Sequence, residues 1–173
     1  MKRLIGLFCC IAAMSVAAAS AAQQPTPPTP TQLLDRLAGK WVLKGVIGGK
    51  ETTHDVDAAW VLNREYLQLH EVSREKKAND QPYEAIVFIS WDAKAQEYRC
   101  LWLDNTEGGG LSVPAARAKR EDHAIPFVFV VSGGEMHTTF TYDKTSDRWN
   151  WTIDDVKDGK ADRFADVTLS RRR

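Results

Sequence analysis

The sequence predicts an all-β protein, an antiparallel up-and-down barrel of about nine or ten strands preceded by one short helix. From Trp41 onward, short runs of apolar and polar residues recur at even spacing, and hairpin-length turns connect them. No long helical pattern interrupts these runs, which argues against a parallel α/β sheet. Closing into a barrel is the best way for such a meander to remove its exposed edges. A two-sheet sandwich is the alternative.

The first 22 residues have the features of a cleaved secretory signal peptide. Lys2 and Arg3 form a basic start, an apolar run covers residues 4–16, and small residues lead up to Ala22. The apolar run is too short for a comfortable membrane span, although an uncleaved anchor is the alternative. We therefore expect an exported protein, periplasmic or extracellular, that has no transmembrane span once the leader is removed.

Composition limits the possible functions of the chain. With 173 residues, 43% hydrophobic and 27% charged, it is suited to one globular domain with a real core. Removing residues 1–22 takes two bases and no acids from the 23 of each, which leaves a formal net charge of −2. Such a chain offers no electrostatic basis for binding nucleic acid. The leader also holds two of the three cysteines, so Cys100 remains alone and no intramolecular disulfide can form.

A proline- and threonine-rich stretch, residues 23–31, follows the leader and reads as an extended tether. We expect Thr31 to cap a short helix that ends at Gly39 and places three leucines on one side: Leu33, Leu34 and Leu37. No repeat and no second linker follow, so residues 32–173 form a single domain.

The expected strands follow one another along this domain. They cover residues 41–47, 56–63, 66–73, 83–91, 98–104, 115–119, 125–131, 136–142, 149–154 and 164–171. Asp92 is placed to bond the backbone of the turn after the fourth strand. Residues 74–81 and the glycine-rich residues 105–110 form the expected longer loops.

Two motifs resemble the lipocalins and fatty-acid-binding proteins, the calycin superfamily. Gly39-Lys40-Trp41 stands at the start of the first strand, and Leu169-Ser170-Arg171 ends the last one. The resemblance implies that Trp41 lies across the closed end of the barrel and that Arg171 packs over it. The chain also resembles an uncharacterised bacterial lipocalin-like family, a domain of unknown function, through residues 37–41, 89–98 and 102–104. That family brings no agreed catalytic residues.

Strand alternation predicts which side chains point into the barrel. The inward sets are Trp149, Trp151 and Ile153; Trp41, Leu43 and Gly45; Val56, Ala58, Trp60 and Leu62; Met136, Thr138, Phe140 and Tyr142; and Ala165, Val167, Leu169 and Arg171. The predicted interior is therefore rich in aromatic residues. One interpretation is a pocket wall for a small apolar or aromatic molecule, formed by Trp60, Trp102, Phe140, Tyr142, Trp149 and Trp151. The other is that these rings fill a small barrel, and both interpretations stay open.

Two polar residues are candidates for chemistry at the barrel mouth. His54 shares its phase with Val56 and is either a ligand-binding or basic group, or a loop histidine before a strand. Asp104 ends an aromatic strand and is either a pocket acid or a turn cap. The other histidines are expected to face water, and no pair of histidines has metal-ligand spacing, so we expect no metal and no cofactor.

The leading hypothesis is an exported protein that binds a small hydrophobic or aromatic molecule in its barrel. A second hypothesis is a hydrolase or isomerase in the same barrel, which would use His54 or Asp104 as a base. Haem binding through one histidine is a variant of the first hypothesis. A third hypothesis is a structural or interaction role in the cell envelope. The sequence does not predict the oligomeric state.

Overall fold

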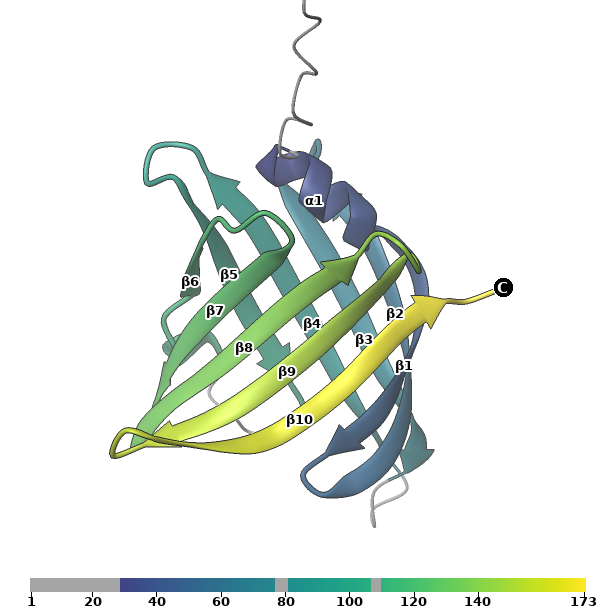
Figure 1. Cartoon of the computed structure of the whole chain (residues 1–173), viewed down its shortest axis with the longest axis vertical. Helices are drawn as coiled ribbons and strands as arrows, with labels where there is room; N and C mark the ends of the chain where they lie inside the picture. Colours follow the sequence, from purple (N-terminus) through teal and green to yellow (C-terminus); the bar gives the residue numbers. More distant parts are fainter. Residues whose placement is uncertain (1–28, 77–80, 107–109) are drawn as a thin grey trace, which may run out of the picture.

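The computed structural model describes residues 29–76, 81–106 and 110–173. The predicted leader and most of the tether, residues 1–28, lie outside this range, as do residues 77–80 and 107–109 of the two longer loops. The described chain is one short helix followed by a closed barrel of ten antiparallel strands. Figure 1 shows the helix, α1, across one end of the barrel. This confirms the predicted fold class.

The elements follow one another in simple order. They are α1 (Pro30–Leu37), β1 (Gly39–Ile47), β2 (Lys50–Val61), β3 (Tyr66–Lys76), β4 (Pro82–Asp92), β5 (Glu97–Asp104), the 3₁₀ turn η1 (Gly110–Ser112), β6 (Ala116–Lys119), β7 (Ala124–Val131), β8 (Gly134–Asp143), β9 (Arg148–Lys157) and β10 (Lys160–Arg171). Each strand pairs with the next, and β1 pairs with β10 from Trp41↔Arg171 to Ile47↔Ala165. Because this last ladder closes the sheet, the two-sheet sandwich is wrong.

The helix begins earlier than expected. Its N-cap is Thr29, whose hydroxyl accepts a hydrogen bond from the backbone N–H of Gln32 at 3.2 Å. Pro30 occupies the first turn, where its missing N–H costs nothing. The prediction that Thr31 caps the helix is therefore wrong by two residues, because Thr31 lies inside the first turn. Leu33, Leu34 and Leu37 are buried against the barrel, as expected.

Strand β2 also begins earlier than expected, at Lys50 instead of residue 56. The segment was expected to be a loop because its residues are polar on both faces, so no apolar alternation marks it. Its backbone still pairs with β1 throughout, down to Ile47↔Lys50. His54 is consequently a buried strand residue and not a loop residue. Leu62, by contrast, lies in the turn after β2 and is 70% exposed, so its predicted inward position is wrong.

The two ends of the barrel differ in how they are covered. Leu34, Leu37 and Trp41 are fully buried where α1 closes one end. At the other end lie the last residues of β1, β3, β5, β7 and β9 and the first residues of β2, β4, β8 and β10, and residues there line a cavity. The turn after β4 forms as expected, because Asp92 Oδ1 accepts hydrogen bonds from two backbone N–H groups.

Candidate functional site

A cavity of about 660 Å³ opens at the end of the barrel away from α1. This volume lies in the middle of the range for small-molecule sites, about 300–1,000 Å³. Most of its wall is apolar and comes from the inward phase of six strands and from Phe164 near the rim. The main apolar contributors are Leu43, Ile47, Trp102, Phe129, Met136, Trp151, Ile153, Phe164 and Val167. Most of the polar side chains in the wall lie on β2, β3 and β4, and the others are Asp104, Thr106 and Thr138.

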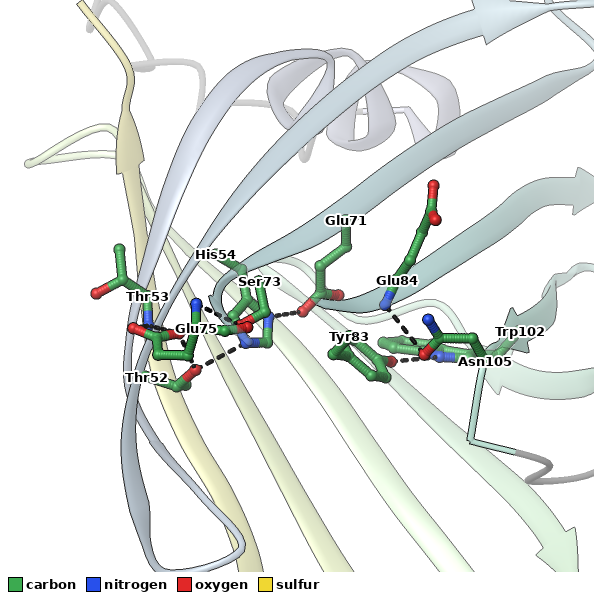
Figure 2. Close-up of polar contacts among 10 residues, drawn as sticks. All are labelled: Thr52, Thr53, His54, Glu71, Ser73, Glu75, Tyr83, Glu84, Trp102 and Asn105. Atoms are coloured by element: carbon green, nitrogen blue, oxygen red, sulfur yellow. Dashed lines mark hydrogen bonds and ion pairs between the residues drawn. The ribbon is translucent and has the colours of Figure 1, made fainter. Parts of the chain in front are cut away.

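A chain of hydrogen bonds forms this polar part (Figure 2). The Nδ1 atom of His54 contacts Oε1 of Glu71, and its Nε2 atom lies 2.8 Å from the Thr52 hydroxyl. Thr52 in turn donates a hydrogen bond to Oε2 of Glu75 at 2.9 Å. The side chains of His54 and Glu71 are only 5% and 4% exposed. The chain thus starts from the buried His54–Glu71 pair and ends at Glu75, near the end of β3.

Counting protons gives the charge of this chain. The chain has three contacts, Glu71–His54, His54–Thr52 and Thr52–Glu75. Each is a hydrogen bond that contains one proton, so the chain holds three protons. The Thr52 hydroxyl supplies one and a neutral His54 ring supplies another. The third makes His54 an imidazolium or Glu71 a carboxylic acid. With Glu75 ionised, the chain carries a net charge of −1 wherever that third proton lies.

Glu75 is held in its ionised form by neutral donors. Burial by itself raises the pKa of its carboxyl group, but hydrogen bonds from the Thr53 backbone N–H and from the Thr52 and Ser73 hydroxyls outweigh it. Together they lower the pKa to about 2, from a usual value of 4.5. Hydrogen bonds to a carboxylate favour its charged form in this way.

Tyr83 continues the polar wall on β4. Its ring centroid lies 5.5 Å from that of His54, and its hydroxyl accepts a hydrogen bond from Nε1 of Trp102 at 3.3 Å. Burial and then the nearby charge of Glu71 raise the pKa of the Tyr83 hydroxyl. Tyr83 therefore stays neutral and joins the polar wall to the aromatic wall.

The structure divides the predicted pocket residues between the two ends of the barrel. Four of them line the cavity: His54, Trp102, Asp104 and Trp151. Phe140 is fully buried behind Trp151, with ring centroids 4.5 Å apart. The other three lie at the closed end. Trp60 donates a hydrogen bond to Asp35 of α1, Trp149 donates to the backbone carbonyl of Arg36, and the Tyr142 hydroxyl bonds Asp147.

Trp41 and Arg171 meet at the closed end. The guanidinium carbon of Arg171 lies 3.7 Å from the centroid of the Trp41 ring, and Trp41 Nε1 donates to the carbonyl of Leu37 at 2.7 Å. Arg171 also donates to the carbonyl oxygens of Ala38 and Arg36. Gly39 makes this stack possible, since a Cβ there would come within 2.4 Å of the Arg171 guanidinium and its φ is +130°. These contacts attach the last strand to the helix.

Asp104 lies at the cavity and also caps a turn. It lines the cavity, and its Oδ1 atom accepts a hydrogen bond from the backbone N–H of Thr106 at 2.8 Å. His70 and His137 bond glutamates and are each 42% exposed at the side chain. Cys100 is fully buried, and burial raises the pKa of its thiol, so it is not an activated nucleophile.

Sequence reasoning missed Glu71, Ser73, Glu75 and Thr52. A usable signal existed for Glu71 and Ser73, which continue the phase of Leu67 and Leu69 on β3, so that alternation places two polar residues on the buried face. A buried acid on such a face needs a partner. Thr52 was hidden by the late start assigned to β2.

Among the described residues, no group of three or more His, Cys, Asp and Glu side chains could hold a metal ion. No helix in the described ranges is long and apolar enough to cross a membrane. The chain matches no known family model and no curated protein. The fold and the site define the class of the protein as a closed ten-stranded up-and-down barrel with a cavity that opens at one end.

Proposed function

We propose that this protein binds a small hydrophobic molecule in the open end of its barrel and acts as a carrier or binding protein. The single observation that carries the proposal is the cavity of about 660 Å³, whose wall is mostly apolar and has most of its polar groups on one side. Apolar walls with a few convergent polar groups are typical of ligand sites. A barrel filled by its own side chains, as the structural hypothesis requires, would not leave this volume.

The likeness to lipocalin-type barrels supports the same proposal. It rests on the Gly39-Lys40-Trp41 motif and on Arg171 stacked over Trp41, in a barrel closed by its first and last strands. In barrels of this kind the interior is the natural place for a ligand. We also propose that residues 1–22 export the protein, so that it works in the periplasm or outside the cell.

The contacts of the two candidate bases do not favour an enzyme. Both ring nitrogens of His54 are engaged, one by Glu71 and the other by Thr52. A general base or a haem ligand needs a free ring nitrogen. Oδ1 of Asp104 accepts hydrogen bonds from the backbone N–H and the hydroxyl of Thr106, which places this carboxylate in a turn cap. Binding without catalysis is therefore the function that the geometry supports best.

The first experiment is native mass spectrometry on protein expressed from the full chain and purified without detergent, followed by organic extraction. We expect a mass that begins at Gln23 and a co-purifying apolar compound. The matched variants are Val167→Trp, which fills the cavity, and Thr168→Trp, on the exposed face of the same strand. The compound, or the neutral dye Nile red as a probe, should bind wild type and Thr168→Trp but not Val167→Trp.

Two outcomes would contradict this proposal. In one, the wild-type protein carries no compound and binds no dye. In the other, Val167→Trp binds the dye as well as wild type does. Circular dichroism of each variant checks that the barrel has formed, and Ala165→Phe, at another buried cavity position, replaces Val167→Trp if that variant does not fold.

A further inference from the structure

One oxygen of the Glu71 carboxyl group has no hydrogen-bond partner among the residues that the structure describes. Oε1 contacts His54, and Oε2 makes no hydrogen bond within the described part of the chain; in Figure 2 no dashed line reaches it. The side chain is 4% exposed and lines the cavity. A polar atom that has no partner is either fully enclosed by protein or exposed to a cavity or to solvent. Among the described residues, Nε1 of Trp151 is the only side-chain nitrogen or oxygen that is fully enclosed and has no partner. Oε2 of Glu71 is therefore not enclosed, and it is open to the cavity.

The charge around this oxygen is negative. The chain from Glu71 through His54 to Glu75 carries a net charge of −1, as the proton count shows. The other charged residues that line the cavity cancel one another formally, since Lys50 and Lys76 are matched by Glu51 and Asp104. A single positive charge in the cavity would bring the described part of its lining to formal neutrality.

The surroundings of Glu71 are suited to a cation with an apolar body. Burying a carboxylate without a full set of donors is costly, and an N⁺–H donor repays that cost best. Tyr83 and Trp102 line the same side of the cavity as Glu71, and aromatic rings attract cations. The opposite wall, formed by Met136, Ile153 and Val167, offers no charge and is suited to hydrocarbon.

We propose that the ligand is a basic amphiphile, an apolar or aromatic body with a protonated amine, whose ammonium group donates a hydrogen bond to Oε2 of Glu71. This inference rests on the proposed binding function and specifies the chemical class of its ligand. The His54–Glu71 pair then serves to hold the carboxylate in place. A fatty acid would instead bring a second negative charge beside Glu71 and Glu75.

The test compares three probes with the same ten-carbon tail: decylamine, decanol and decanoate, each measured at neutral pH by displacement of Nile red from the wild-type protein. We expect decylamine to bind at least about tenfold more tightly than decanol, as a charge-assisted hydrogen bond predicts, and decanoate to bind most weakly. Equal affinity for amine and alcohol, or tighter binding of decanoate, would overturn the inference. If none of the three binds and Nile red does not bind, it is the proposed function that fails.

The variant Glu71→Gln sharpens the test. A glutamine can still accept a hydrogen bond from His54 but has no charge, so we expect decylamine affinity to fall about tenfold to the level of decanol. Decanol affinity should change by less than about threefold. The control is Glu84→Gln, which removes an exposed carboxylate on β4 that bonds His70, and it should leave all three affinities unchanged. An unchanged preference for the amine in Glu71→Gln would show that Glu71 does not bind it.

Discussion

The two ends of the barrel use the same kinds of side chain for different purposes. At the closed end, polar atoms of aromatic residues donate to α1: Trp41, Trp149 and Tyr98 bond carbonyl oxygens of Leu37, Arg36 and Pro30. At the open end, the polar groups bond one another and leave Oε2 of Glu71 open to the cavity. The closed end is thus satisfied from within the protein, and the open end has capacity left for a ligand.

Strand β9 shows this difference within three residues. Trp149 and Trp151 lie on the same face and are both buried. Nε1 of Trp149 donates to the carbonyl of Arg36 at 3.3 Å, whereas Nε1 of Trp151 has no hydrogen-bond partner in the described part of the chain. Protein interiors rarely leave such donors unpaired. An unpaired donor at the cavity wall is therefore consistent with a region that is not optimised for stability alone.

The largest expected effect is a difference in the free energy of unfolding between substitutions at the closed end and at the open end. Trp41→Ala removes a fully buried indole, its hydrogen bond to Leu37 and the surface on which Arg171 stacks. We expect it to lower the free energy of unfolding by about 3–5 kcal/mol. Trp102→Ala, at the half-buried wall of the cavity, should cost only about 1–2 kcal/mol. Urea unfolding followed by circular dichroism measures both values.

We expect the two variants to rank in the opposite order when the affinity for Nile red is measured instead of the free energy of unfolding. Trp102→Ala should weaken binding of the dye, while Trp41→Ala should bind normally under conditions in which the barrel is folded. If Trp102→Ala destabilised the protein as much as Trp41→Ala does, the division into a structural end and a binding end would be wrong.

The sequence predicts the fold well because the fold depends on local signals. Each residue shows directly whether it continues the alternation of a strand or belongs to a turn. Ten strands that are joined by hairpin turns can form only a few topologies. The site is harder to predict, since alternation gives the face of a side chain but not its depth along the barrel axis. Trp60 and Trp102 both point inward by this rule, yet one bonds α1 through Asp35 and the other lines the cavity.

The polar wall was missed for a related reason. Lys50 to Asp55 lack apolar alternation, so the strand that positions Thr52 and His54 gives no hydrophobic signal. Glu75 lies just past the last apolar residue of β3, where a polar run reads as a loop. Only pairing with neighbouring strands, which sequence alone does not give, brings Thr53 and Glu75 together.

A second prediction concerns the two tryptophans of β9. Trp149→Phe removes one of the two donors to the Arg36 carbonyl, the other being Arg171, together with part of a buried ring, so we expect a loss of about 1–2 kcal/mol. Trp151→Phe removes ring volume but also an unpaired N–H, and these changes offset each other, so the loss should be smaller, below about 1 kcal/mol. Thermal or urea unfolding of the two variants decides the ranking, and a larger loss for Trp151→Phe would show that its N–H is satisfied in solution.

The smallest expected effect compares two carboxylates whose pKa is lowered by different means. Arg74, and with it Arg172, lowers the pKa of Asp55 to about 2 against the opposing effect of burial. For Glu75, burial is opposed by neutral N–H and O–H donors, and its pKa also falls to about 2. In both cases the folded pKa is below the usual one, so each carboxylate stabilises the fold at neutral pH. That stabilisation is lost as the pH falls from the usual values of 3.8 and 4.5 toward about 2.

Salt separates the two mechanisms. The free-energy difference between wild type and Asp55→Asn should shrink in about 1 M NaCl, where the Debye length is about 3 Å, because a half-exposed arginine pair is screened. The difference between wild type and Glu75→Gln should persist in the same salt, since hydrogen bonds from neutral donors carry no net charge to screen. Urea unfolding at neutral pH and near pH 2, each at low and high salt, measures both differences. A salt-sensitive Glu75 would mean that a cation, and not Thr52, Thr53 and Ser73, holds this carboxylate, and the net charge assigned to the cavity wall would then have to be raised.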